Sequence, residues 1–273
     1  MSAATGPRIT RSVILLALML FAVVPLISMF TTALAAPGST PQGLSWPSHP
    51  HWHNFVDAWN GANLLALFRS SALIVLGVVP ATVAMATVAG YALAQLRVPG
   101  GKVIYALLLV GLTLPVEALI TPLYYDIQSL GLLGSRWAIV LPLVGLLMPF
   151  GAFWMRAHFL NAEVALSEAA EIDGANTWQT FCRIHLPLAR SAWSALAVLF
   201  FLATWNQYLL PLVLVNDPTK RTVAGGLGAF QGQYGTNIVL LCAGSLLIIL
   251  PSLVIFLIFQ RHFVKALLQG AIK

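Results

Sequence analysis

Acidic side chains are scarce in this chain, yet half of them lie in one short stretch. The sequence has eight Asp and Glu residues, and four of them fall close together: Glu163, Glu168, Glu171 and Asp173. On a helix, the i, i+3, i+4, i+7 spacing beside these acids gives a narrow stripe of mostly small side chains, Leu166, Ala169, Ala170 and Asp173. This pattern predicts a helix that seats in a groove of another protein. The alternative is a solvated linker whose charges are grouped by chance.

Local signals predict that this helix is one arm of a bent pair. Gly174 can adopt φ > 0 and end the first helix. Asn176 or Thr177 can cap a second helix, and Pro187 suits the first turn of the apolar run that follows.

Composition places the remainder of the chain in lipid. Of 273 residues, 59% are apolar and only 8% are charged, with a mean hydropathy of +0.87, whereas soluble domains carry roughly a quarter charged residues. The net charge of +6 comes from basic residues scattered singly, which argues against nucleic acid. Cys182 and Cys242 do not imply a disulfide framework.

Six apolar runs are long enough for a membrane span, which takes about 20 helical residues. They cover residues 12–35, 67–95, 102–124, 134–157, 189–213 and 236–260. We therefore expect an all-α integral membrane protein with one six-span domain, 12–260, between an N-terminal segment, 1–11, and a C-terminal tail, 261–273. The loops 158–188 and 214–235 are too short to hold a second folded domain.

The distribution of Lys and Arg predicts the orientation. Ten of these residues fall on the side of the termini: Arg8, Arg11, Arg97, Lys102, Arg156, Arg183, Arg190, Arg261, Lys265 and Lys273. Four fall on the other side: Arg69, Arg136, Lys220 and Arg221. By the positive-inside rule, both termini and loop 158–188 are expected in the cytoplasm, and loop 214–235 outside.

The N-terminus imitates a cleavable secretory signal, with Arg8 and Arg11 before an apolar run and small residues at 33–36. The run from Ser12 to Ala35 is longer than the roughly 7–15 residues of a signal core, so we expect an uncleaved first span.

Two further patterns concern helix packing. Ala86, Gly90 and Ala94 repeat at four-residue intervals, which indicates close helix contact. Prolines lie within or at the ends of the spans and favour kinks, which suit either a gated pathway or a static bundle. They are Pro80, Pro115, Pro142 and Pro211.

The stretch that contains the acids resembles a known motif. Glu168-Ala169-Ala170, three residues, Gly174, nine residues, Ile184, one residue and Leu186-Pro187 match the EAA loop of permease subunits in binding-protein-dependent ABC importers without a gap. With Asp173, Ala175 and Phe181, the motif resembles the sugar-importer form.

The resemblance extends over essentially the whole chain and is strongest to the maltose-type, MalG-like, inner-membrane permease subunits. The run 205–208, Trp-Asn-Gln-Tyr, is similar to the Trp-Asn-x-aromatic signature of that group. The segments 260–265 and 270–273 resemble its C-terminal tail.

The resemblance implies a role for each part of the motif. The EAA loop would act as a coupling helix in a cleft of a separate ATPase subunit, with Glu168 for a polar contact and Gly174 for the bend. The chain would be a non-catalytic half of a carbohydrate pathway. Its partners would be a second homologous permease, two ATPase subunits that hold ATP and Mg²⁺, and an external solute-binding protein. Which sugar is carried stays open.

In the same family, the last external loop reaches toward the solute-binding protein. Here it is glycine-rich and carries two aromatic and two amide side chains that suit a sugar: Phe230, Gln231, Gln233 and Tyr234. The alternative is a plain glycine-rich turn between spans.

Three polar residues are candidates for a transport pathway: Glu117, Asn206 and Gln207. A charge at a membrane centre costs about 2.5–3.5 kcal/mol on insertion scales. Because Pro115 and Pro122 flank Glu117, the helix is expected to be distorted there, and a structural hydrogen bond from this side chain to freed backbone is the alternative to solute contact.

Other chemistry has less support. His49, His51 and His53 alternate and could bind a metal, but Pro47 and Pro50 interrupt the segment and no metal is expected. The sequence has no phosphate-binding Gly-x-x-x-x-Gly-Lys-Ser/Thr motif, no His-Glu-x-x-His and no Gly-x-Ser-x-Gly. An ion-gradient-driven transporter would need intramembrane charges, and only Glu117 offers one. An intramembrane enzyme would need a paired nucleophile and base.

Overall fold

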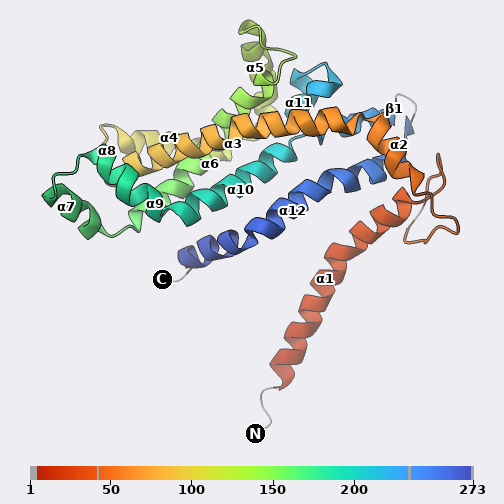
Figure 1. Ribbon diagram of the computed structural model, residues 1–273, viewed down its shortest axis with the longest axis horizontal. Helices are drawn as coiled ribbons and strands as arrows, with labels where there is room; N and C mark the ends of the chain where they lie inside the picture. The colour runs from red at the N-terminus through yellow and green to blue at the C-terminus, as the bar shows by residue number, and fades with distance from the viewer. Residues whose placement is uncertain (1–4, 42, 233–234, 272–273) are drawn as a thin grey trace. The chain divides into compact units, whose positions relative to one another are not determined.

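The computed structural model describes residues 5–41, 43–232 and 235–271, and the described chain is mostly helical (Figure 1). The only strands in these ranges are β1, Gln231–Gly232, and β2, Gly235–Thr236, which pair antiparallel. The all-α prediction is confirmed. The chain forms two compact units, one made of Met1–Leu65 with Gly226–Leu250 and the other of Ala66–Gly225 with Pro251–Lys273.

The helices follow the apolar runs and the loop between them. In chain order they are α1 Thr5–Ala33, α2 His53–Gly61, α3 Leu64–Gln95, α4 Gly101–Thr113, α5 Val116–Ser129, α6 Trp137–Leu160, α7 Val164–Ile172, α8 Thr177–Thr180, a π-helix Phe181–His185, α9 Leu186–Leu188, α10 Arg190–Trp205, α11 Leu209–Leu214, 3₁₀ turns Pro218–Lys220 and Gly225–Phe230, and α12 Ile238–Ala271.

Four helices of the described chain are long and apolar enough to cross a membrane: α1, α3, α6 and α12. Two further helix pairs pass the same test but are bent at a short break, α4 with α5 by 106° and Thr177–Leu188 with α10 by 72°. Six spans therefore result if each bent pair crosses once. The run 102–124 is divided between α4, which ends at Thr113, and α5, so the bend lies at Pro115, where the sequence favours a kink.

Proline explains the first break. Pro115 has no backbone N–H to bond to the carbonyl of Gly111, and its ring pushes the preceding residue out of the helical region. Leu114 is accordingly extended, with ψ 126°, and so is Pro115, with ψ 127°. The new helix, α5, then starts at Val116 in a different direction.

A second proline interrupts the predicted span 189–213. α10 ends at Trp205 and α11 begins at Leu209, so that Pro211 lies in the first turn of α11. A proline at 211 leaves the carbonyl of Gln207 without its helical donor. The hydroxyl of Thr222 donates a hydrogen bond to that carbonyl instead. The break is therefore satisfied within the protein, as a low-dielectric surrounding requires.

Small residues bring α3 and α6 into close contact within their unit. A Cβ atom on Gly90 would lie 2.6 Å from Cβ of Met155 and 2.7 Å from the backbone nitrogen of Arg156. One on Gly151 would lie 2.6 Å from Cβ of Ala86. Ala94 packs against the same buried cluster. The predicted stripe is confirmed as a packing surface. α4 and α10 also pack on α6.

The other unit is joined by a buried amide. Asn54 of α2 is almost completely buried, and its Nδ2 donates to the carbonyl oxygens of Ala33 at 2.9 Å and Ala35 at 2.8 Å. These carbonyls lie at the end of α1, where no helical donor is available. The backbone N–H of His51 donates to the carbonyl of Leu34 at 2.9 Å.

We predict that Gly90→Ala destabilises the folded chain by about 1–3 kcal/mol, because even one methyl group would overlap the backbone of α6. Gly145→Ala is the matched control on α6, since no atom lies within 4 Å of its Cβ position. Thermal unfolding of the two detergent-purified variants would measure the difference. Equal midpoints would show that α3 and α6 do not meet at Gly90.

Candidate functional site

The bend after α7 is built as the sequence predicts. Gly174 has φ +77°, in the left-handed region that side chains other than glycine rarely adopt. Its N–H donates to the carbonyl of Glu171 at 3.0 Å, and the N–H of Ala175 donates to the carbonyl of Ala170 at 2.9 Å. This pair of bonds is a Schellman motif, which satisfies the last carbonyls of α7 and turns the chain away.

The second arm has a reciprocal cap. The side chain of Asn176 accepts from the N–H of Gln179 at 2.9 Å, and the side chain of Gln179 accepts from the N–H of Asn176 at 2.9 Å. Between the two predicted caps, Asn176 is therefore the one used. Because each arm is fixed at the bend, we call residues 164–188 the elbow.

A π-helix continues the elbow and was not predicted. Residues Phe181–His185 form it, and α9, Leu186–Leu188, follows. The sequence predicts Pro187 in the first turn of the following span. In the structure Pro187 lies in the first turn of α9, and the chain bends at Ala189 before α10 begins. The extra residue of a π-turn rotates the side chains that follow it. Here Phe181 and His185 both become buried.

His185 ties the elbow to the helix bundle. Its Nε2 lies 2.8 Å from Oγ of Ser167 on α7, within hydrogen-bonding distance. The imidazole ring is 5.2 Å from the ring of Tyr91 on α3 and 6.2 Å from that of Phe159 on α6. The Tyr91 ring also lies 4.8 Å from that of Phe181. A series of packed rings therefore connects α7 to α3 and α6.

Sequence reasoning missed Ser167, His185 and Tyr91. His185 lies between Ile184 and Leu186, within the motif. A histidine flanked by apolar residues in a loop was the available signal for a buried polar junction. Tyr91 carried no such signal, since it lies among apolar residues of a span.

The exposed face of α7 is one residue out of step with the predicted stripe. Ala170 is buried in the chain itself, and Leu166 is half-buried. The side chains that face away repeat with the same helical spacing: Ala165, Glu168, Ala169 and Ile172. Ile172 is 86% exposed. The prediction that Ala170 faces a partner is therefore wrong in this structure, because the Ser167–His185 contact turns that side inward.

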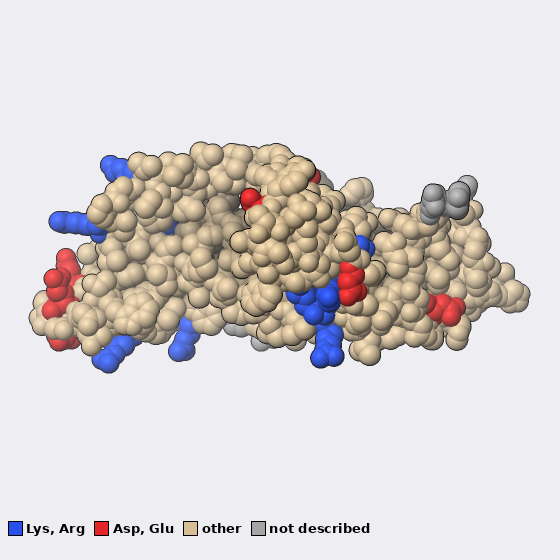
Figure 2. Space-filling model, turned by 90° about the horizontal axis from the view of Figure 1, so that it is seen from above, with Lys and Arg blue, Asp and Glu red and all other residues tan. Residues whose placement is uncertain are grey.

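The remaining motif residues differ in burial. Ile184 and Leu186 are half-buried, and Leu186 packs against the cluster that contains Phe159 and Phe181. Asp173 is exposed at the end of α7. In Figure 2, acidic side chains gather at the end of the molecule formed by α7. The elbow thus presents small, apolar and acidic groups on one outward face.

The glycine-rich loop is partly ordered by an aromatic ring. Phe230 is buried, and its ring fills the space beside Gly244, where a Cβ would come within 2.8 Å of it. The prediction that this loop displays Phe230 is wrong, since the ring anchors it. Gln231 is exposed on β1. Gln233 and Tyr234 lie outside the described residues.

An Asp caps an earlier turn of the same loop, 214–235. Asp217 Oδ1 accepts from the hydroxyl of Thr219 at 2.7 Å and from its N–H at 3.0 Å. Both hydrogen bonds lower the pKa of the Asp217 carboxyl, and the bond from the Thr219 hydroxyl has the larger effect.

The candidate pathway residues lie at the two helix breaks. Glu117 is exposed in the first turn of α5, with no side-chain bond to the helix end. Asn206 is exposed after α10, and its Nδ2 donates to the carbonyl of Leu202 at 2.9 Å. Gln207 is half-buried. Glu117 is therefore available to a solute or a partner chain and is not used to satisfy the freed backbone.

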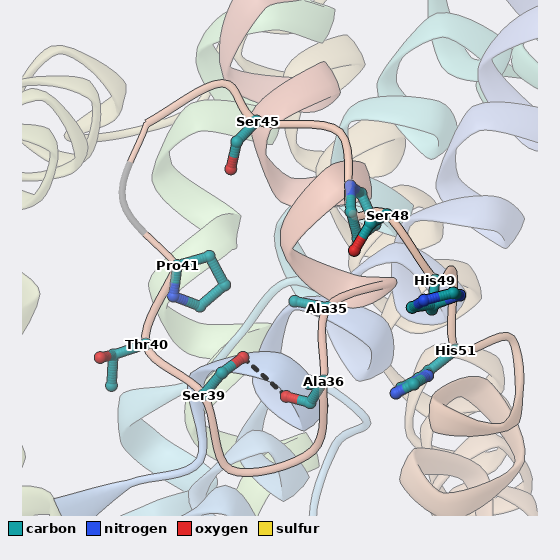
Figure 3. Close-up of a pocket in the computed structure, with 10 residues that line it drawn as sticks. Ala35, Ala36, Ser39, Thr40, Pro41, Ser45, Ser48, His49 and His51 are labelled. Carbon is teal, nitrogen blue, oxygen red and sulfur yellow. Dashed lines mark hydrogen bonds between the residues drawn. The ribbon is translucent and has the colours of Figure 1, made fainter.

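The alternating histidines are divided between two surroundings. His49 and His51 line a loop pocket of about 350 Å³ that Ser39 also lines, and the hydroxyl of Ser39 donates to the carbonyl of Ala36 at 2.6 Å (Figure 3). His53 instead lies 3.3 Å from Asp57, one turn along α2. Within the described ranges, no group of three potential metal ligands is present.

Comparison with known proteins identifies the family. The family of binding-protein-dependent transport system inner membrane components matches residues 83–269. The diacetylchitobiose uptake system permease protein NgcG of Streptomyces coelicolor is 31% identical over 262 residues, which cover 94% of this chain and 87% of that protein. The melibiose/raffinose/stachyose import permease protein MelC of Bacillus subtilis is 27% identical, over 92% of this chain and 91% of that protein.

A solved structure has the same fold. One chain in the crystal structure of a bacterial ABC transporter involved in the import of the acidic polysaccharide alginate superposes with a TM-score of 0.78. The match covers 96% of this chain and 99% of that chain, at 20% sequence identity. The family match over most of the helices and the near full-length relative show that this chain belongs to the inner membrane components of binding-protein-dependent transport systems.

Proposed function

We propose that this chain is the permease subunit that forms half of a carbohydrate pathway in an ABC importer, and that a separate ATPase subunit drives it through the elbow. One observation carries the coupling role. One face of α7 is exposed, while on the other side Ala170 is buried and Ser167 lies 2.8 Å from His185.

The exposed face of α7 has suitable chemistry for a protein groove. Ala165 and Ala169 allow close approach, and Ile172 offers apolar area whose burial yields about 25 cal/mol per Å². Glu168 offers a carboxylate beside them for a polar contact. When ATP closes the two ATPase subunits, α7 would move with them. The packed rings of His185, Tyr91 and Phe159 would then carry that movement into α3 and α6.

The full transporter would contain four further kinds of component around this chain. These are a second homologous permease, two ATPase subunits, an external solute-binding protein and the lipid of the plasma membrane. ATP and Mg²⁺ would bind in the ATPase subunits, so this chain would be non-catalytic. The excess of Lys and Arg on one side supports cytoplasmic termini, with the elbow in the cytoplasm and loop 214–235 outside.

A sugar or sugar derivative is the proposed cargo. The two relatives compared above are named for the uptake of diacetylchitobiose and for the import of melibiose, raffinose and stachyose. Glu117, Asn206 and Gln207 lie at the helix breaks, where polar groups can line a path. The ion-gradient-driven alternative is not supported, because the family couples transport to a binding protein.

We predict that Gly174→Val leaves membrane insertion intact but abolishes uptake. A β-branched residue at φ +77° costs about 1–3 kcal/mol and would reopen the bend. Gly174→Asn is the matched control, because asparagine tolerates this backbone region. Uptake would be measured in cells with the sugar that most stabilises the cognate binding protein in a thermal-shift screen. Normal uptake by Gly174→Val would contradict the proposal.

We also predict that a photo-crosslinker at position 169 captures the ATPase subunit and that one at position 170 does not. Ala169 is exposed and Ala170 is 5% exposed, although they are neighbours. Crosslinked partners from intact cells would be identified by mass spectrometry. Capture from 170 but not from 169 would show that the opposite face of α7 is the docking face.

Removal of the β1–β2 hairpin should affect the interaction with the solute-binding protein and leave the interaction with the ATPase subunit unchanged. Deletion of residues 231–236 leaves the anchor Phe230 in place and is expected to reduce sugar-stimulated transport at least tenfold. Assembly with the ATPase should be unchanged, because the elbow lies elsewhere in the chain. Co-purification of the ATPase and uptake would be measured on the same membranes. Unaltered uptake would leave this loop as a plain turn.

A further inference from the structure

A basic pocket lies where α3, the N-terminus of α4 and the C-terminal half of α6 meet. Its volume is about 330 Å³. Three cationic side chains line it, Arg97, Lys102 and Arg156, together with Tyr105 and the apolar residues Leu96 and Val98. All of these elements belong to one compact unit. None of the residues that line the pocket is acidic.

Among the residues that the structure describes, no acidic group pairs with these three cations. In the described part of the chain, the ion pairs within 4.0 Å are those of His53 with Asp57 and of Lys220 with Asp217. Arg97 and Lys102 are exposed at the mouth of the pocket, and Arg156 is half-buried. Three like charges that share one concave surface repel each other unless an anion lies between them.

Arg156 is held in place by groups that leave its charge uncompensated. Its Nε donates to the carbonyl of Leu93 at 3.3 Å. Its guanidinium carbon lies 4.0 Å from the centroid of the Tyr105 ring, which is a cation–π contact. A guanidinium fixed in this way keeps N–H groups for a phosphate, which it can bind with two parallel hydrogen bonds.

The start of α4 adds to the same field. Gly100 has φ +70° and turns the chain so that α4 begins at Gly101, directly beside Lys102. The N–H groups of Gly101 and Val103 already donate to the carbonyls of Val98 and Gly100, so the start of α4 contributes the positive end of its helix dipole, which favours an anion. α4 has 13 residues, enough for this effect.

The surroundings of the pocket are apolar along α4. Leu109 and Leu112 lie one and two turns after Tyr105 on the same face of the helix, and they are 37% and 41% exposed. An occupant of both surfaces has an anionic head and hydrocarbon tails. We propose that this pocket binds the phosphate headgroup of an anionic phospholipid, with its acyl chains along α4. This site depends on the membrane location of the chain and is independent of the cargo and of the elbow.

The test is lipid binding to the full chain in detergent, measured by native mass spectrometry with phosphatidylglycerol and phosphatidylcholine. Phosphatidylglycerol should bind more tightly. Arg97→Gln with Lys102→Gln should weaken its binding about thirtyfold, since each of the two cations contributes about 1 kcal/mol near a lipid surface. Phosphatidylcholine binding should not change. The charge-conserving pair Arg97→Lys with Lys102→Arg should retain most of the affinity, which guards against a loss caused by misfolding.

The matched control is Arg183→Gln with Arg190→Gln, which removes the same charge from exposed positions outside the pocket. An equal loss in this control would indicate diffuse attraction and overturn the site.

Two arms distinguish the source of the phosphate and the class of occupant. Displacement of phosphatidylglycerol by millimolar inorganic phosphate would indicate a free-phosphate site and overturn the lipid assignment. A photoactivatable phosphatidylglycerol should label peptides that contain residues 93–105 or 156, in both purified chain and native membranes. Labelling of the purified chain alone would mean that a protein subunit covers the pocket in the membrane, which also overturns the proposal.

Discussion

The contact between Ser167 and His185 determines what the elbow can do. At 2.8 Å it joins α7 to a ring cluster that reaches α3 and α6. Without this contact, α7 would be a short acidic helix between two loops and could rotate about Gly174. With this contact, one side of α7 packs against the bundle and the other side faces outward. Which side of α7 faces outward and which side faces the ring cluster follows from this one hydrogen bond and the rings beneath it.

The same end of this unit also contains the basic pocket, and α6 links the two. Phe159 of α6 packs against His185, and its carbonyl accepts from Nε2 of Gln95 at 2.6 Å, near the end of α3. Arg156, one turn earlier on α6, reaches back to Leu93 of α3. The acidic elbow and the cationic pocket therefore share one structural base. A membrane lipid in the pocket would lie next to the surface on which the ATPase is proposed to act.

Proline and the low dielectric of the membrane explain the broken spans. A proline in a helix frees one carbonyl, and in lipid that carbonyl needs another donor. At Gln207, the Thr222 hydroxyl supplies it. At Leu114 and Pro115 the chain becomes extended, and Glu117 stays exposed in the next helix. Both breaks place polar side chains within or at the end of an apolar run, while the neighbouring helices stay intact. In contrast, α3 and α6 run through Pro80, Pro142 and Pro149 without a break.

Local chemistry was readable from the sequence alone. The apolar runs, the close-packing stripe at Gly90, the left-handed turn at Gly174 and the cap at Asn176 each depend on a residue and its near neighbours along the chain. The EAA resemblance depended on spacing in the same way.

Tertiary structure decided which side of each element faces inward. The exposed stripe of α7 differs from the predicted one by a single residue, because His185, distant by 18 positions, draws Ser167 and Ala170 inward. Phe230 became an anchor because Gly244 leaves room for its ring. Arg97, Lys102 and Arg156 line one pocket because the end of α3, the start of α4 and the C-terminal half of α6 lie next to each other. Contacts between distant segments depend on the packing of whole helices, and no local pattern in the sequence specifies that packing.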